Sequence, residues 1–287
     1  MTKGILIYAH NNRTVDYALM ALISGGLAKK NLRCPVSLVT DQTTVDWMME
    51  SDIYHRAETI FEHIFIVDRP GSNNMRSLYD GVGSSSVVQF INTNRYSAYD
   101  ITPYDRTLLI DADFLVLSNR LEEYWDVDCD VLIGDSINDI YDQQRLGYQD
   151  RYVSDVGIKL YWATTVMFTK NIYSKMFFDL VRHIRNYYQY YADTYRFDAR
   201  TYRNDIAFSV AKHVLEGFEQ TDIGSLPAVL TLQDRDILHS VNDDKLTVLV
   251  STKMDYNYCA ATVHNIDLHV MNKQSLIRNS AKLLELI

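Results

Sequence analysis

Short apolar runs alternate with stretches of helical spacing over the first 117 residues. Buried strands are expected at residues 4–9, 36–40, 64–67 and 107–110, with helices at 17–29 and 45–49. Apolar runs this short and rich in β-formers are typical of strands buried on both faces. Strands that alternate with helices predict a parallel sheet covered by helices. The expected fold class is therefore α/β, with a Rossmann-like, mostly parallel sheet flanked by helices.

The later pattern is less regular. An apolar continuation is expected at 114–117, strands at 131–133 and 161–168, and helices at 87–99, 170–191 and 205–217. Residues 69–86 contain Pro, Gly, Ser and Asn, so we expect a long functional loop there. Without an internal repeat or a clear linker, the sequence predicts one domain over residues 1–287.

Charge and cysteine content exclude several classes of protein. The net charge of −9 argues against general coating of nucleic acid, which requires clustered Lys and Arg. Cys34, Cys129 and Cys259 are widely spaced, which indicates neither a zinc knuckle nor a disulfide framework. The sequence shows neither a membrane span nor a signal-peptide core, so we expect a cytoplasmic protein that meets its acceptor in solution.

Two carboxylates follow the apolar strand at 107–110. Asp111 and Asp113 would lie beyond its carboxyl end, where open α/β sheets bind ligands. Carboxylates beside a buried strand repel each other and resist desolvation, and a divalent cation removes both costs. Oxygen ligands suit Mn²⁺ or Mg²⁺, and such an ion can bind a diphosphate. The alternative is that the two carboxylates cap a neighbouring helix.

Residues 104–117, Tyr-Asp-Arg-Thr-Leu-Leu-Ile-Asp-Ala-Asp-Phe-Leu-Val-Leu, resemble the central motif of GT-A glycosyltransferases. The likeness is to the glycogenin and galactosyltransferase-like branch, and residues 95–125 are its specific part. The resemblance implies a GT-A fold and a metal-dependent glycosyltransferase that uses a nucleotide-sugar donor, expected to be a UDP-sugar. It also implies a nucleotide-sugar binding half at 1–117 and an acceptor half at 118–287.

The same resemblance assigns residues that bind the donor. They are Ala9, His10 and Asn11 beside the base, Asp41 on the uracil or ribose, Arg95 on the donor, and Ala112 between the two carboxylates. Late in the chain, Lys273 is expected to neutralise the diphosphate. A neutral imidazole would complete the metal shell, and both His269 and His264 are candidates.

The acceptor side is less defined. Residues 163–165, Ala-Thr-Thr, stand where many relatives carry Asn-x-Gly, which leaves donor contacts there open. Asp205 resembles a position that contacts the transferred sugar or the acceptor, although it also suits a helix cap. The branch resemblance implies retention of anomeric configuration. An inverting enzyme would need a carboxylate base, for which Asp135 or Asp205 could serve.

Residues 182–203 hold five Arg and six Tyr in an otherwise acidic chain. Interleaved Arg and aromatic side chains can stack on bases and contact phosphates. Because some GT-A enzymes of bacterial viruses glycosylate modified bases, a hydroxylated base in DNA is one candidate acceptor, beside a glycan or small molecule. The simpler interpretation is an amphipathic helix with a solvated Arg face.

Two other functions compete with glycosyl transfer. A phosphohydrolase would use Asp111 as nucleophile and Asp113 as acid/base, but Leu115 stands where such enzymes carry Thr or Val. A non-catalytic nucleic-acid-binding protein on a degenerate transferase fold would rely on residues 182–203. A nucleotidyltransferase would need a glycine-rich loop after the first strand, which the polar turn at 10–12 lacks.

Overall fold

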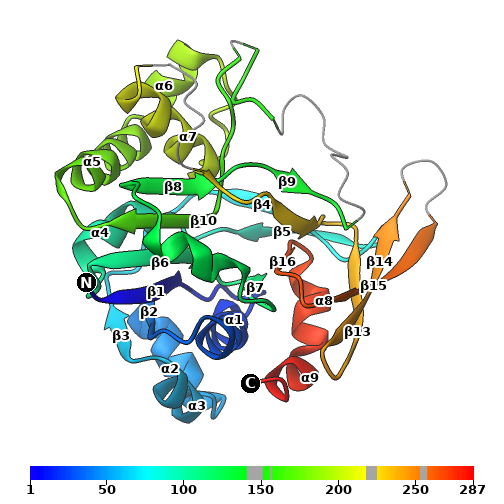
Figure 1. The fold of residues 1–287 in the computed structure, drawn as a ribbon. Coiled ribbons are helices and arrows are strands. Elements are labelled where there is room, and N and C mark those ends of the chain that lie inside the picture. The colour runs from blue at the N-terminus through cyan, green and yellow to red at the C-terminus, as the bar shows by residue number, and fades with distance from the viewer. Residues whose placement is uncertain (141–150, 156, 218–224, 253–256) are drawn as a thin grey trace.

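The computed structural model describes residues 1–140, 151–155, 157–217, 225–252 and 257–287. A seven-stranded sheet forms the centre of the molecule, in the order β11-β8-β10-β6-β1-β2-β3 (Figure 1). Its strands are β1 (Lys3–Tyr8), β2 (Val36–Thr40), β3 (His63–Ile66), β6 (Arg106–Asp111), β8 (Val131–Gly134), β10 (Trp162–Thr169) and β11 (Ser225–Leu226). Strands β6, β1, β2 and β3 run parallel, while β10 is antiparallel to both of its neighbours. The α/β fold with a mostly parallel sheet is confirmed.

Helices cover both faces of this sheet (Figure 1). On one face, α1 (Tyr17–Leu32) packs against β1 and β2, with α2 (Gln42–Glu50) and α3 (Tyr54–Ile60) beside it. On the other face, α7 (Asn204–Leu215) packs on β10 and against α5 (Ile172–Asn186). Edge-to-face contacts among Phe168, Phe177, Phe178 and Phe208 join these elements. Such aromatic pairs add to the burial of apolar surface and fix the helices on the sheet.

A smaller, four-stranded sheet begins directly after β6. Its order is β7-β16-β12-β9, with β7 (Phe114–Leu115), β16 (Leu268–Val270), β12 (Val229–Leu232) and β9 (Ile137–Asn138). Strand β16 pairs antiparallel with β7, so residues about 155 positions apart in the chain become neighbours. The C-terminal helices α8 (Lys273–Arg278) and α9 (Ser280–Leu284) follow directly, and α9 packs on α1.

A three-stranded meander lies beside this sheet. It consists of β13 (Ile237–Asn242), β14 (Lys245–Ser251) and β15 (Tyr258–His264), paired antiparallel in that order. Alternate residues of β14 are buried, which is the period-two pattern of a sheet with one covered face. In the part of the chain that the structure describes, each helix is too short or too polar to cross a membrane.

A hairpin replaces the long loop and the helix expected over residues 69–99. Strand β4 (Met75–Tyr79) pairs antiparallel with β5 (Ser85–Gln89), and only a short 3₁₀ turn (Arg95–Ser97) and α4 (Ala98–Ile101) are helical. The loop prediction is wrong because both strands are mostly exposed and polar, so they lack the apolar run of a buried strand. The helix prediction is wrong because the apolar residues from Val87 onward have a spacing that also fits a helix. Gly81 has φ +71° in the turn between the strands, a conformation that glycine adopts without strain.

The tip of this hairpin is tied to the C-terminal part of the chain. Asp80 accepts hydrogen bonds from both terminal nitrogens of Arg278 in α8, at 2.5 and 2.8 Å. The side-chain amide of Asn272 donates to Asp80 at 3.3 Å, and the amide of Val82 donates to the hydroxyl of Tyr258 at 2.9 Å. The hairpin is therefore held in place from two sides.

The other expected strands and helices are found close to their expected bounds. The strand expected at 36–40 matches β2, and the helix expected at 205–217 corresponds to α7. The helix expected at 170–191 is two helices, α5 and α6 (Tyr188–Tyr195), because the chain leaves helical geometry at Tyr187. The sequence did not predict this break between α5 and α6, because the apolar pattern continues through Tyr187.

Candidate active site

The last residue of β6 and the turn after it place two carboxylates at the carboxyl edge of the central sheet. Asp111 ends β6, and Asp113 lies immediately before β7. The hydroxyl of Ser24 in α1 donates to the carbonyl of Phe114 at 2.6 Å, which fixes the start of β7. The carboxylate of Asp113 is 8% exposed and that of Asp111 is 31% exposed, so Asp111 is the more accessible of the two.

The pairing of β16 with β7 brings His269 beside Asp113. His269 is opposite Phe114 in the strand register, and the amide of Val270 donates to the carbonyl of Asp113 at 3.0 Å. Nε2 of His269 lies 3.4 Å from Oδ2 of Asp113. Candidate ligand atoms of Asp111, Asp113 and His269 all lie within 4.8 Å of one another. Among the sequence-predicted site residues, these three form a group with the size of a metal shell.

Lys273 completes this group. It is the first residue of α8, whose N-cap Asn272 accepts from the amide of Ser275 at 3.0 Å. Its ammonium donates to Oδ2 of Asp113. We refer to Asp111, Asp113, His269 and Lys273 as the cavity cluster. The four residues come from the two halves expected from the sequence, with Lys273 and His269 in the second.

Burial and charge act in opposite directions on the two carboxylates. Burial alone would raise the pKa of Asp113, but the charges of Lys273 and His269 hold it far below its usual range. Burial opposes the ammonium of Lys273 as well, yet Asp113 raises its pKa. Burial also raises the pKa of Asp111, although Arg95 partly opposes this. Asp113 is therefore firmly ionised, whereas the charge on Asp111 is not fully compensated.

Arg95 holds Asp111 through a hydrogen bond from the buried side of the cavity. Its side chain is buried, and Nη1 donates to Oδ1 of Asp111 at 2.9 Å and to the carbonyl of Ala163 at 2.5 Å. The guanidinium also lies 6.0 Å from the centre of the Phe208 ring. Arg95 thus lines the inner end of the cavity and orients Asp111.

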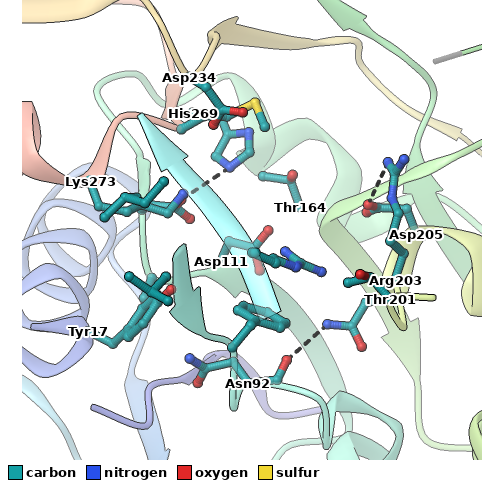
Figure 2. Close-up of a pocket in the computed structure, with 18 of the residues that line it drawn as sticks. Tyr17, Asn92, Asp111, Thr164, Thr201, Arg203, Asp205, Asp234, His269 and Lys273 are labelled. Carbon is teal, nitrogen blue, oxygen red and sulfur yellow. Dashed lines mark hydrogen bonds and ion pairs between the residues drawn. The ribbon is translucent and has the colours of Figure 1, made fainter. Parts of the chain in front are cut away.

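The cavity cluster lines a cavity of about 510 Å³, shown in Figure 2. Its walls come from β6, β10, α1, α7, α8 and the β4–β5 hairpin. The lining includes Tyr17, Arg76, Asn92, Ala112, Thr164, Arg203, Asp205 and Asp234. A volume of this size accommodates a ligand of cofactor dimensions.

The residues present fit a divalent cation. Two carboxylates and one imidazole form a donor set that suits Mn²⁺ or Mg²⁺. Nδ1 of His269 is buried and has no hydrogen-bond partner among the described residues, so this ring nitrogen is available to a ligand or proton. The ammonium of Lys273 pairs with Asp113, so the charge of this buried carboxylate is compensated by a cation in the same cavity.

Asp205 lies across the cavity from the cavity cluster, in the first turn of α7 (Figure 2). Oδ1 accepts from the amide of Ala163 at 3.1 Å, and Oδ2 is 3.3 Å from Nη2 of Arg203. Of the three residues in place of the Asn-x-Gly, Thr164 lines this cavity, while Thr165 lines a separate one of about 240 Å³. The two cavities lie on opposite faces of β10.

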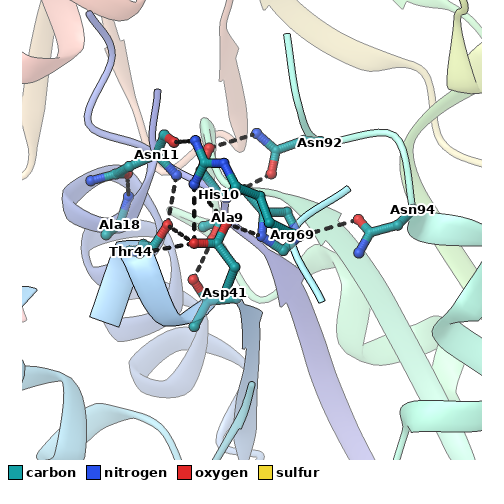
Figure 3. A network of polar contacts seen from close by, with 10 residues as sticks. Ala9, His10, Asn11, Ala18, Asp41, Thr44, Arg69, Asn92 and Asn94 are labelled. Atoms are coloured by element: carbon teal, nitrogen blue, oxygen red, sulfur yellow. Dashed lines mark hydrogen bonds and ion pairs between the residues drawn. The ribbon is translucent and has the colours of Figure 1, made fainter. Parts of the chain in front are cut away.

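His10, Asp41 and Arg69 form a second polar group, the buried network (Figure 3). Nδ1 of His10 is 2.9 Å from Oδ2 of Asp41, and Nη1 of Arg69 is 3.1 Å from both Asp41 oxygens. Asp41 also accepts from the amide of Thr44 and caps α2. Burial opposes the charge of Asp41, but the bond to His10 and the other donors lower its pKa.

The structure does not bring this group to the cavity. His10 and Asp41 are 0% and 1% exposed, and neither lines the cavity. Their polar atoms are bonded to each other and to Asn94, Thr44 and Arg69. Ala9 is buried, and its carbonyl accepts from Thr40 at 2.7 Å. Asn11 accepts from the amide of Ala18 at 2.8 Å, at the start of α1. The expected contacts of these residues with the base therefore find no geometric support.

Two further predicted residues lie outside the cavity. Asp135 follows β8 and forms an ion pair with Lys159. His264 ends β15, is about half exposed, and lies 3.2 Å from the carboxylate of Asp244. The structure therefore places His269, not His264, beside Asp111 and Asp113. Strand β15 is the edge of the meander, whereas β16 is the strand that pairs with β7 among the described residues.

Arg182, Arg185 and Arg200 each have a partner within the chain, although the Arg200 side chain is 89% exposed. Arg182 pairs with Asp100, Arg185 donates to the carbonyl of Thr93, and Arg200 pairs with Asp198. The ring of Tyr188 packs on those of Phe197 and Tyr202. The stretch is thus a packed helical corner, and it does not support DNA as the acceptor.

Sequence reasoning missed Tyr17, Arg76 and Asp234, which all line the cavity. A signal existed for Arg76: in Met75–Tyr79, Arg and Leu alternate with exposed residues ahead of a Gly-rich turn, which is a hairpin pattern. Asp234 follows β12, and its place depends on pairing with a distant strand. Burial raises its pKa.

No protein-family model matches the chain, and no curated protein matches it. Solved structures show similarity. Galactosyltransferase LgtC, in complex with donor and acceptor sugar analogues, is 16% identical over 72% of this chain and 70% of that one, with a TM-score of 0.42. Mouse xyloside xylosyltransferase 1 is 10% identical over 80% and 86%, with a TM-score of 0.45. GlyE of Streptococcus pneumoniae TIGR4 is 14% identical over 79% and 45%, with a TM-score of 0.38. Related folds host different chemistry, so function has to come from the cavity itself.

Proposed function

We propose that this chain is a metal-dependent glycosyltransferase, which transfers a sugar from a nucleoside-diphosphate sugar to an acceptor hydroxyl. One observation carries the proposal: Asp111, Asp113, His269 and Lys273 converge in a single cavity at the carboxyl end of β6. Ligands of open α/β sheets bind at this edge. Two carboxylates, an imidazole and an ammonium match the needs of a cation bound to a diphosphate.

Each member of the cavity cluster has a defined task. Asp111, Asp113 and His269 would hold Mn²⁺ or Mg²⁺, which supplies positive charge to the departing nucleoside diphosphate. Lys273 is a point charge in the same cavity and suits a phosphate oxygen. Arg95 keeps Asp111 oriented through its 2.9 Å hydrogen bond. UDP is the nucleotide that the sequence resemblance favours.

The acceptor is expected to lie on the Asp205 side of the cavity. Asp205 is fixed there by Arg203 and the amide of Ala163 and can orient a hydroxyl group. Asp135 lies outside the cavity, so of the two candidate bases for an inverting reaction Asp205 is the one that lines it. The resemblance to the galactosyltransferase-like branch nevertheless favours retention of anomeric configuration. Proton NMR of the first product formed distinguishes the α from the β anomer and tests this.

The phosphohydrolase alternative conflicts with the state of Asp113. That enzyme would need Asp113 to carry a proton as general acid. Lys273 and His269 overcome its burial and hold the pKa of Asp113 far below its usual range, so the carboxyl is ionised across the physiological range. Oδ1 of Asp111, the nucleophile of that scheme, is bonded to Arg95.

A thermal-shift screen of nucleotide sugars tests the proposal. UDP-, GDP- and CDP-sugars are added with Mn²⁺, with Mg²⁺ and with EDTA, and donor hydrolysis is followed in parallel. We expect one class of nucleotide sugar to raise the melting temperature only with the metal, because a bound ligand stabilises the folded state by mass action. Failure of every nucleotide sugar to bind or hydrolyse would refute the proposal.

A further inference from the structure

Arg76 is a cavity cation that the proposed chemistry does not use. It lies on β4 opposite Val88 of β5, and the hairpin turns it into the cavity beside Tyr17 and Asp205. Its guanidinium lies 3.6 Å from the centre of the Phe90 ring, which covers one face of the group. The nitrogens at its edge are the donors that remain.

The other cavity cations each have a carboxylate partner. Arg95 is bonded to Asp111, Arg203 to Asp205, and Lys273 to Asp113. Arg76 has no ion pair with any residue that the structure describes, and its one hydrogen bond, to the carbonyl of Tyr202, measures 3.3 Å. Burial lowers its pKa, which shows that the charge is costly where it stands. A guanidinium offers five donors, so most of its capacity is unused.

We propose that Arg76 is a specificity-determining residue that binds an oxyanion, a carboxylate or a phosphate, on the substrate that meets the Asp205 side of the cavity. A planar guanidinium that is stacked on a ring binds such a group through two parallel hydrogen bonds. The diphosphate is already matched by the cavity cluster, so this second anion belongs to the transferred sugar or to the acceptor.

The neighbours of Arg76 support this position. Its hydrogen bond goes to the carbonyl of Tyr202, just before α7, which carries Asp205 in its first turn. The guanidinium of Arg76 therefore lies beside the segment that carries Asp205, and Asp205 has the larger effect on its pKa of the two carboxylates Asp205 and Asp111. Without a ligand, Asp205 attracts it only from a distance and is committed to Arg203. The assignment of the anion to a donor or an acceptor rests on the proposed function. The observation that Arg76 is a cavity cation without a carboxylate partner among the described residues does not.

Matched substrate pairs test the inference. For the donor, UDP-glucuronate is compared with UDP-glucose, and GDP-mannuronate with GDP-mannose, in Mn²⁺. For the acceptor, glucuronate and glucose 6-phosphate are compared with glucose, in the presence of UDP and Mn²⁺. We expect the anionic member of one pair to bind about tenfold to a hundredfold more tightly, measured by calorimetry. The arm that shows the preference identifies which substrate carries the charge.

Three variants separate this role from a structural one. Arg76→Met keeps the stacked volume and should abolish the preference, whereas Arg76→Lys should keep only part of it because the planar fork is lost. The control is Arg235→Met. Arg235 is exposed and does not line the cavity, and its guanidinium lies 5.2 Å from the ring centre of Tyr79, a residue of the same hairpin as Arg76. It should leave the preference unchanged.

The outcomes also separate the two proposals. Equal binding of charged and neutral members in every arm, or a preference that survives in Arg76→Met, overturns the role of Arg76 and leaves glycosyl transfer intact. Arg76-dependent binding of the anionic monosaccharides without binding of any nucleotide sugar overturns glycosyl transfer and supports Arg76. Failure of every compound to bind overturns both.

Discussion

The buried network and the cavity cluster are built from similar residues at the same edge of the central sheet. In the buried network, Asp41 receives His10, Arg69 and Thr44, and its pKa falls. In the cavity cluster, Asp111 has Arg95 as its cation partner, remains accessible, and has a raised pKa. The comparison shows that residue type does not identify a site here. What differs is the position of the polar groups: the cavity cluster lines the cavity, whereas His10 and Asp41 are buried away from it.

The strongest way to break this comparison is Asp113→Asn. It removes a charge from the metal shell and the partner of Lys273, and donor turnover should fall on the order of 10³-fold. Asp126→Asn is the control, because that carboxylate is 85% exposed and bonded to Lys3 at the surface. Turnover is measured with Mn²⁺ at saturating donor. Equal turnover in Asp113→Asn and the parent protein would remove Asp113 from the mechanism.

Asp41→Ala should act on stability instead. It leaves His10 and Arg69 without their shared carboxylate, at a cost of about 3 kcal/mol in the free energy of unfolding. Because the folded pKa of Asp41 is lowered from 3.8, its contribution is present above that pH and is lost as the pH falls below it. Urea unfolding at several pH values measures both effects. Asp46→Ala, on the exposed face of α2, is the control.

A selective loss of turnover in Asp41→Ala, at unchanged stability, would contradict this assignment. It would return Asp41 to the role that the sequence resemblance implied, as a contact of the uracil or ribose.

Lys273→Met sharpens the comparison inside the cavity cluster. The variant keeps the length of the side chain but removes the charge that suits the diphosphate, and we expect donor turnover to fall roughly 10²-fold. Lys282→Met in α9 is the control, since its ammonium is exposed and pairs with Glu285. If Lys273→Met lowers the melting temperature and leaves turnover of the folded protein unchanged, Lys273 is structural.

Asp111→Asn should have the smallest effect on folding, and of opposite sign to Asp41→Ala. A folded pKa raised above 3.8 means that ionised Asp111 destabilises the fold at neutral pH, so its neutral analogue should raise the melting temperature by about 2 °C. The measurement is made in EDTA, where no ion compensates the charge. A lowered melting temperature would show that the bond to Arg95 dominates.

Much of the parallel sheet could be predicted from the sequence, because its strands are apolar on both faces. The run at 107–110 is followed by Asp111 and Asp113, so local pattern alone placed both carboxylates at the ligand-binding edge. Lys273 was identified by resemblance, and Asp113 contacts it. Their contact with each other joins positions 160 residues apart and follows from the β7–β16 pairing, which no local pattern encodes.

Other parts could not be predicted for the same physical reason. His10 and Asp41 were assigned to the donor by resemblance, and only the side-chain geometry shows that they are bonded to each other and to neighbouring residues. The resemblance favoured His269 and left His264 as a rival, and strand register separates the two. Arg76 was hidden by a hairpin whose exposed residues resemble a loop.

The ties at the hairpin tip give the C-terminal helix α8 two duties at once. Its first residue, Lys273, touches Asp113, and its last, Arg278, grips Asp80 at the far end of the strand that carries Arg76. A rigid shift of this short helix would displace both the contact with Asp113 and the hairpin that lines the other side of the cavity. A change within residues 273–278 should therefore affect Lys273 and the hairpin that carries Arg76 at the same time.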